Sequence, residues 1–313
     1  MIELIGAPFD LCGRRRGSRL GPAALRLAGL EKWLRDLNLE THDTGDVAVS
    51  DPLSELTGLE ALEPCVHVTR SLKVAVLRSL EAGRTPLVLG GDHSIAMGSV
   101  AAALEFAGRS PAVLWIDAHA DINTPSTSPS GNLHGMTLSA LTHLPEPENG
   151  PHSHAWNRLV AEVIGPQALD ANRIGWLGLR EVDPEESRRI RSFPHSFVAT
   201  MTDIDRDGIA RMVARLVDWL DRSGAAELWI SFDVDALDPG LAPGTGTAVR
   251  GGLTYREAHF TAEMLHQAMS REKCPWRLLG LDVVEANPLI DWENGTSRMA
   301  VEWVASLFGK RIL

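Results

Sequence analysis

Three short segments of the sequence place acidic side chains and histidines directly after apolar runs. They read Gly-Gly-Asp-His-Ser at 90–94, Asp-Ala-His-Ala-Asp at 117–121 and Ser-Phe-Asp-Val-Asp at 231–235. Alternate side chains of an extended chain point to one side, so we expect the ionisable groups within the second and third segments to face together. Such groups, away from water, repel and desolvate one another unless a cation lies between them. A metal site is therefore favoured over a hydrogen-bonded polar corner, which stays the alternative.

The candidate metal ligands are two imidazoles and four carboxylates. Six protein ligands exceed the four of one tetrahedral zinc ion, and bridging carboxylates would let the set serve two ions. Oxygen-rich ligation with a minority of nitrogen suits Mn²⁺ better than zinc, with Fe, Co and Ni as alternatives. We therefore expect two Mn²⁺ per chain. The ligands are His93, Asp117, His119, Asp121, Asp233 and Asp235.

Apolar runs of strand length alternate with segments of helical periodicity, and together they must position these ligands. Repeated strand-then-helix order predicts an α/β fold with a mostly parallel sheet, helices on both faces and functional groups at the carboxyl ends of the strands. The expected strands are Glu3–Pro8, Pro86–Gly90, Ala112–Asp117, Arg173–Leu179, Glu227–Asp235 and Leu278–Glu285. The expected helices are Pro22–Leu37, Pro64–Ala82, Ser94–Phe106, Arg206–Arg222, Thr254–Met269 and Thr296–Phe308.

Composition narrows the class of protein. The chain has 313 residues, 44% of them apolar and 23% charged, which is typical of a globular protein and excludes a disordered chain. A net charge of −11 argues against a nucleic-acid partner. No apolar run reaches the roughly 18 residues of a membrane span and no signal peptide is evident, so we expect a cytoplasmic protein without a membrane partner. No linker divides the chain, so we expect one domain over residues 1–313.

The three segments resemble, in order and spacing, the signatures of the ureohydrolase superfamily of arginases, agmatinases and formiminoglutamases. The resemblance extends from Ile5-Gly6-Ala7-Pro8 to Glu285-Ala286-Asn287-Pro288. It implies a three-layer αβα fold and a binuclear manganese centre. By this resemblance one ion takes His93, Asp117, Asp121 and Asp233, and the other takes His119 and Asp235 with the shared Asp117 and Asp233.

Within that superfamily the loop over 121–135 resembles the arginase branch. In arginases the positions of Asn123 and Ser130 hold the α-carboxylate of the substrate, and Ser128 keeps a hydroxyl where threonine is common. The segment 178–184 is similar to the one whose second acid, here Asp183, meets the α-amino group, while Glu181 stands where aspartate is more familiar. The resemblance therefore implies L-arginine as the substrate, hydrolysed to L-ornithine and urea.

The resemblance also implies the catalytic roles. A guanidinium carbon resists attack because its charge is delocalised, and a hydroxide held between two metal ions is the expected nucleophile. Asp121 is expected to accept a hydrogen bond from that hydroxide, Glu285 to pair with the guanidinium, and Thr247 to lie nearby. His134, on the loop, is expected to relay a proton to the leaving amine.

Three other functions are considered. Agmatinases and other guanidino-acid ureohydrolases share the metal ligands and differ only in the loops that contact the substrate tail. A catalytically silent sensor or scaffold that binds guanidino compounds would have lost ligands, and none is lost. Binuclear metallophosphoesterases use similar elements, but in another order.

The superfamily resemblance further implies a homo-oligomer, a trimer or hexamer, because Arg256 and Glu257 match its subunit-contact segment. Glu257 also forms a capping box with Thr254 in the sequence pattern. The run Arg14-Arg15-Arg16 would repel a guanidinium, so we expect it in a solvated loop.

Overall fold

The structure is a computed structural model that describes residues 1–49 and 55–312. Within these ranges eight strands form a single sheet in which every neighbouring pair is parallel. The strands are β1 (Ile2–Ala7), β2 (Thr41–Asp46), β3 (Thr85–Gly90), β4 (Ala112–Ile116), β5 (Ile174–Leu179), β6 (Phe197–Thr200), β7 (Glu227–Asp233) and β8 (Arg277–Val284). Their order in the sheet is β2-β1-β3-β8-β7-β4-β5-β6.

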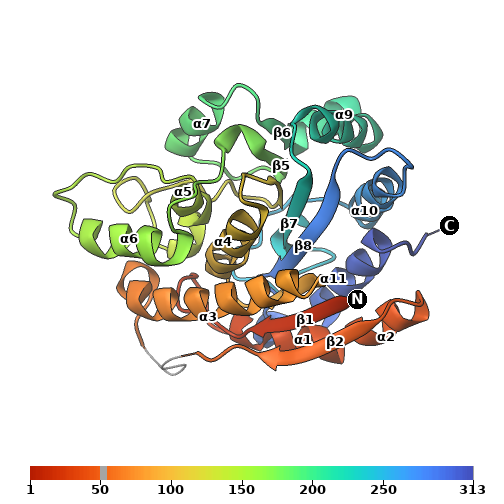
Figure 1. Ribbon diagram of the computed structural model, residues 1–313, viewed down its shortest axis with the longest axis horizontal. Helices are drawn as coiled ribbons and strands as arrows, with labels where there is room; N and C mark the ends of the chain where they lie inside the picture. The colour runs from red at the N-terminus through yellow and green to blue at the C-terminus, as the bar shows by residue number, and fades with distance from the viewer. Residues whose placement is uncertain (50–54, 313) are drawn as a thin grey trace.

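Helices cover both faces of this sheet, which gives a three-layer α/β fold (Figure 1). The prediction of a mostly parallel sheet between two helical layers is confirmed. The helices are α1 (Gly21–Leu27), α2 (Leu30–Asp36), α3 (Leu62–Glu81), α4 (Ala96–Ala107), α5 (Thr137–Leu141), α6 (Ser153–Leu159), α7 (Pro184–Arg191), α8 (Met201–Asp207), α9 (Ile209–Arg222), α10 (Tyr255–Met269) and α11 (Gly295–Leu307).

The direction of each connection along the sheet decides which face its helix covers. The connections β2 to β3, β3 to β4, β4 to β5 and β5 to β6 all run along the sheet toward the edge formed by β6. Their helices, α3 to α7, pack into one core cluster. The connections β1 to β2, β6 to β7 and β7 to β8 run in the opposite direction, toward the edge formed by β2. Their helices, α1, α2, α8, α9 and α10, pack into the second cluster. Parallel strands are joined almost always by right-handed crossovers, so reversing the direction moves the helix to the other face.

All six predicted strands are present, but β2 and β6 were missed. Both are edge strands: β2 is mostly exposed and has the polar sequence Thr-His-Asp-Thr-Gly-Asp, and β6 has only four residues. Neither carries the apolar run that marks a strand covered on both faces.

Two predicted helices are each divided at a glycine. The segment Pro22–Leu37 is interrupted at Gly29 (φ 89°), and Arg206–Arg222 at Gly208 (φ 81°). A right-handed helix cannot continue through a positive φ, so α1 and α2, and likewise α8 and α9, are separate helices. The capping box at Thr254 is confirmed. Among the described residues no helix combines the length and the apolar character that crossing a bilayer requires.

Candidate active site

Five strands that are adjacent in the centre of the sheet carry polar side chains at their carboxyl ends. At or just beyond their carboxyl ends lie His93 after β3, Glu285 after β8, Asp233 on β7, Asp117 after β4 and Asp183 after β5. Because all strands are parallel, these ends meet at the same side of the sheet, as predicted. The site is therefore assembled from residues up to 192 positions apart, such as His93 and Glu285.

The turn that carries His93 requires a glycine. A Cβ at Gly91 would lie 1.8 Å from the carbonyl oxygen of Phe9, so no larger residue fits there without backbone movement. Asp92 then fastens the turn: its carboxylate accepts backbone hydrogen bonds from Cys12 (2.8 Å) and Gly13 (3.1 Å). This arrangement places His93 in the first turn of the short helix His93–Ile95.

The expected extended alternation of the ligand segments is wrong. β4 ends at Ile116, Asp121 has a left-handed φ of 51°, and Asp235 lies in a 3₁₀ helix rather than on β7. The segments turn because a carboxylate at the strand end accepts a hydrogen bond from the backbone N–H two residues later. The backbone N–H of His119 donates to Asp117, and that of Asp235 donates to Asp233, both at 2.7 Å. The side chains converge through these turns and not through strand pleating.

His93 is surrounded by three carboxylates. Its Nδ1 lies 3.1 Å from Asp117 Oδ2, 3.2 Å from Asp121 Oδ2 and 3.2 Å from Asp233 Oδ2. These approaches lack hydrogen-bond geometry, and within the described residues neither His93 Nδ1 nor Asp117 Oδ2 has a hydrogen-bond partner. Buried polar atoms without partners are rare, and a cation between them would satisfy both.

A second group shares Asp117 with the first. His119 Nδ1 lies 3.3 Å from Asp117 Oδ1 and 3.1 Å from Asp235 Oδ2. Thr247 donates to that same Asp235 oxygen at 2.8 Å, and Glu181 lies 3.5 Å from the outer nitrogen of His119. The ligand atoms of His93, Asp117 and Asp233 lie within 4.8 Å of one another, as do those of Asp117, His119 and Asp235. Asp121 joins the first group through its contact with His93. The expected six ligands are thus brought together as two neighbouring groups.

The electrostatics of these groups indicate missing positive charge. Burial, together with the charges of Asp235 and Asp117, raises the pKa of the Asp233 carboxyl well above its usual range. Burial alone would lower the pKa of His93, but the neighbouring carboxylates raise it well above its ordinary value. Both groups therefore favour protonation, as acids crowded in a dry site do. Divalent cations would relieve this crowding, and the mixed oxygen and nitrogen donors fit a first-row transition metal.

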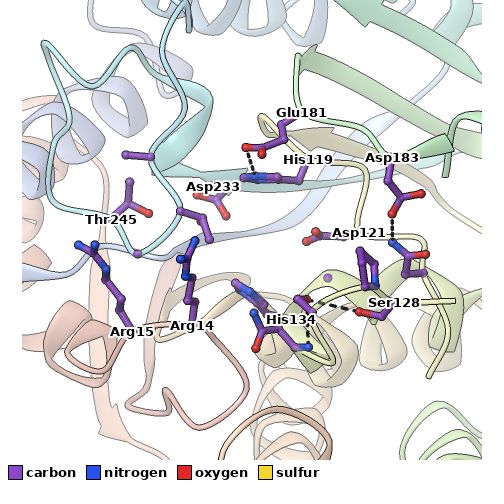
Figure 2. Close-up of a pocket in the computed structure, with 18 of the residues that line it drawn as sticks. Arg14, Arg15, His119, Asp121, Ser128, His134, Glu181, Asp183, Asp233 and Thr245 are labelled. Atoms are coloured by element: carbon purple, nitrogen blue, oxygen red, sulfur yellow. Dashed lines mark hydrogen bonds and ion pairs between the residues drawn. The ribbon is translucent and has the colours of Figure 1, made fainter. Parts of the chain in front are cut away.

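A cavity of about 590 Å³ opens above these groups and has chemically distinct sides (Figure 2). Asp121, Asp233 and His119 line its floor, and Glu181 and Asp183 line one wall. Arg14 and Arg15 are exposed on the opposite side. Arg14 and Arg15 are thus solvated as expected, but they also form the mouth of the cavity. Arg16 is instead half-buried and pairs with Asp10 at 3.3 Å.

The loop over 123–135 supplies another part of the lining. Asn123, Ser128 and Ser130 all line the cavity, and the hydroxyls of the two serines lie 3.4 Å apart. Asn123 Nδ2 donates to Asp183 Oδ2 at 2.6 Å, so two residues predicted from separate segments are in direct contact. The remaining oxygen of Asp183 accepts the N–H groups of Glu185 and Glu186 and caps α7. Asp183 is therefore held rigidly at the cavity wall.

His134 and Glu285 form the remaining part of the predicted site. His134 lines the cavity and its Nδ1 contacts Glu285 Oε1, which also accepts the backbone N–H of His93. Glu285, like Asp121, has a left-handed φ, here 65°, and such strain in non-glycine residues concentrates at functional sites.

Several buried residues of the site were not predicted from the sequence. Glu186 lines the cavity, and burial raises the pKa of its carboxyl to about 7. The hydroxyl of Ser231 contacts His93 Nε2 and donates a hydrogen bond to Asp282. Asp282 is a charged residue inside an apolar strand run, Leu-Gly-Leu-Asp-Val-Val, and this polar interruption was the available signal.

Comparisons with known proteins identify the family of the chain. A model of the arginase family matches residues 1–309. The chain is 41% identical to an arginase of Staphylococcus aureus (strain MRSA252), over 100% of this chain and 98% of that protein. The native structure of an arginase from Bacillus caldovelox at pH 5.6 has a TM-score of 0.87 at 36% identity, and an arginase structure from Bacillus subtilis has 0.85 at 35% identity. Each comparison covers 100% of this chain and 99% of the solved chain.

Proposed function

Because the chain belongs to the arginase family of amidinohydrolases, we propose that it hydrolyses L-arginine to L-ornithine and urea. One observation carries the proposal: a single cavity joins two carboxylate and histidine groups on its floor to the Asn123–Asp183 pair on its wall. The first feature suits cleavage of a guanidinium group. The second suits recognition of an amino-acid tail.

We propose that the two groups hold two Mn²⁺ ions. His93, Asp117, Asp121 and Asp233 would bind one ion, and His119 and Asp235, with the shared Asp117 and Asp233, the other. Bound there, the ions would supply Lewis-acid chemistry that lowers the pKa of water and so provides a nucleophile at neutral pH. The unpartnered Nδ1 of His93 and Oδ2 of Asp117 support this occupancy.

Binding of the guanidinium is assigned to Glu285. The contacts of its carboxylate with His93 and His134 both fall on Oε1, so Oε2 is the oxygen that would pair with the cationic group. Asp121, buried on the cavity floor, would accept the hydrogen of the attacking water. Thr247 lies at the metal groups through its contact with Asp235, and this supports its expected place near the reacting centre.

Protonation of the leaving amine is assigned to His134. Its imidazole lies on the cavity lining beside Glu285, and burial of the pair strengthens their interaction. A proton transferred from His134 to the leaving nitrogen would let that nitrogen depart as a neutral amine when its bond to the guanidinium carbon breaks.

Recognition of the substrate tail is assigned to the opposite part of the cavity. Ser128, Ser130 and Asn123 would bind the α-carboxylate, and Asp183 the α-amino group. An enzyme for agmatine needs none of the carboxylate contacts, and this distinguishes the closest alternative function. A catalytically silent sensor is disfavoured because the whole ligand set converges.

The test is release of urea from a panel of guanidino compounds after incubation with Mn²⁺. Urea from L-arginine that disappears after chelation supports the proposal, and no urea from any compound overturns it.

We also propose a homo-oligomer, a trimer or hexamer, through the segment of Arg256 and Glu257. Static light scattering that shows a monomer at micromolar concentration would contradict this.

A further inference from the structure

Asp282 is a fully buried acid in the middle of β8 that contacts none of the proposed metal ligands directly. Its carboxylate is 0% exposed and is satisfied by three donors. Trp229 Nε1 (2.7 Å) and Ser99 Oγ (2.8 Å) donate to Oδ2, and Ser231 Oγ donates to Oδ1. Burial raises the pKa of the Asp282 carboxyl, and its hydrogen bonds from Ser231, Trp229 and Ser99 oppose that shift. In all three contacts the oxygens of Asp282 accept.

The hydrogen of Ser231 is committed to this acceptor. A serine hydroxyl has a single hydrogen, so the oxygen of Ser231 can only accept from its other partner, His93 Nε2, at 2.8 Å. His93 must then carry its proton on Nε2. Its Nδ1 faces the carboxylates of Asp117, Asp121 and Asp233 and is therefore the nitrogen available to a metal ion.

Packing fixes the ring in the same orientation. The imidazole of His93 stacks on Trp115 with the ring centroids 3.9 Å apart and the planes within 2°. Rotation of the ring would lose this stacking and the hydrogen bond to Ser231 together. The plane and the tautomer of His93 are thus both determined from outside the metal groups.

We propose that Asp282 is a positioning residue of the metal site, which acts through Ser231 to hold His93 in the tautomer whose Nδ1 can bind a metal ion. The inference rests on the metal site of the proposed function and does not depend on the substrate. Outer partners of metal-binding histidines commonly set the tautomer, and their loss costs about 10- to 100-fold in metal affinity.

The variant Asp282→Asn should reverse the hydrogen-bond chain rather than remove it. Trp229 Nε1 can only donate, so the amide oxygen of Asn must face Trp229 and its NH₂ group must face Ser231. Ser231 then accepts from the amide and donates its hydrogen to His93 Nε2. This places the imidazole proton on Nδ1, where it blocks the metal.

The experiment measures Mn²⁺ affinity of the full chain by calorimetry after chelation and dialysis. Asp282→Asn should weaken the affinity of one site by about 10- to 100-fold. Ser231→Ala removes the relay without reversing it and should weaken that site by less. Ser99→Ala is the matched control: it deletes another donor to the same carboxylate but leaves the relay intact, and it should bind Mn²⁺ as the unchanged chain does.

A second readout follows the proton itself. The protein is labelled with ¹⁵N-histidine, loaded with diamagnetic Zn²⁺ and studied by NMR, and the His93 signal is assigned by its absence from His93→Asn. His93 should be protonated at Nε2, and the Nε2–H signal should be lost in Asp282→Asn. A merely structural role of Asp282 would lower the melting temperature without moving the proton.

Wild-type affinity in both Asp282→Asn and Ser231→Ala would overturn the inference, as would equal losses in Ser231→Ala and Ser99→Ala. If Asp282→Asn does not fold, the comparison of the two serine variants decides. If the unchanged chain takes up no metal, the proposed metal site itself fails.

Discussion

His134 Nδ1 lies 2.7 Å from Glu285 Oε1, although the two residues are 151 positions apart. The contact joins the loop beyond β4 to the end of β8. It places a titratable imidazole directly beside the carboxylate that we assign to the guanidinium. Proton transfer and substrate binding are therefore predicted to be coupled through one ion pair.

The protonation of His134 should depend on Glu285. Burial alone would lower the pKa of His134, but the Glu285 carboxylate raises it to about 9. Because this exceeds the value of about 6.5 in an unfolded chain, the pair stabilises the fold fully below pH 6.5 and less as the pH rises through 9. In Glu285→Gln the pKa should fall markedly, as followed by NMR titration of the metal-free protein. An unchanged pKa would contradict this coupling.

Replacement of His134 by Asn should separate catalysis from metal binding. A positioned acid or base contributes about 100- to 10,000-fold to the rate, so kcat should fall by at least about 100-fold. The bound metal, measured by elemental analysis, should be unchanged because His134 belongs to neither metal group. Loss of metal in this variant would instead identify His134 as a ligand.

Asp183 should combine substrate recognition with a structural role, and two variants can separate them. Asp183→Asn keeps an oxygen that caps α7 but removes the charge for the α-amino group, so kcat/KM for L-arginine should fall by about 10- to 100-fold with little change in stability. Asp183→Ala should lose the cap as well, at about 1 kcal/mol in the free energy of unfolding. Both should lower kcat/KM for 4-guanidinobutyrate, which has no α-amino group, by less than for L-arginine, because Asp183 also holds Asn123. Kinetics and thermal unfolding of the two proteins test this.

The metal content should be two Mn²⁺ per chain. The two groups share Asp117 but contain different histidines, so each can hold one ion. Elemental analysis of the manganese-loaded protein measures the stoichiometry, and His119→Asn should weaken one site more than the other. A stoichiometry of one would exclude the binuclear arrangement.

The sequence was sufficient to predict the central strands and the acidic and histidine side chains that converge at their ends. The central strands are mostly apolar because both faces are covered, and the candidate ligands lie at or just beyond their ends, as Asp117 follows Ile116 of β4. The predicted residues do converge, but the local geometry expected for them is wrong, since Asp121 turns with φ 51° instead of continuing a strand. The residues could be found because the motifs follow strand ends, and the expected alternation of an extended strand was not needed for this.

Contacts between distant segments could not be predicted in the same way. The hydrogen bond from Asn123 to Asp183 and the relay from Asp282 through Ser231 depend on strand order, which no local pattern records. The edge strand β2 was missed because its exposed polar residues resemble a loop. The assignment to a single domain and the oligomeric state stay predictions.

The most direct test of the proposed function is the ratio of kcat/KM for L-arginine to that for agmatine, measured with the manganese-loaded protein. Agmatine lacks the carboxylate that Asn123 and Ser130 are proposed to bind, and each hydrogen bond to a charged group is worth about 1.5–3 kcal/mol. We predict a preference for L-arginine of at least about 100-fold, which corresponds to two such contacts. Equal or faster turnover of agmatine would contradict the arginase assignment while leaving the metal site intact.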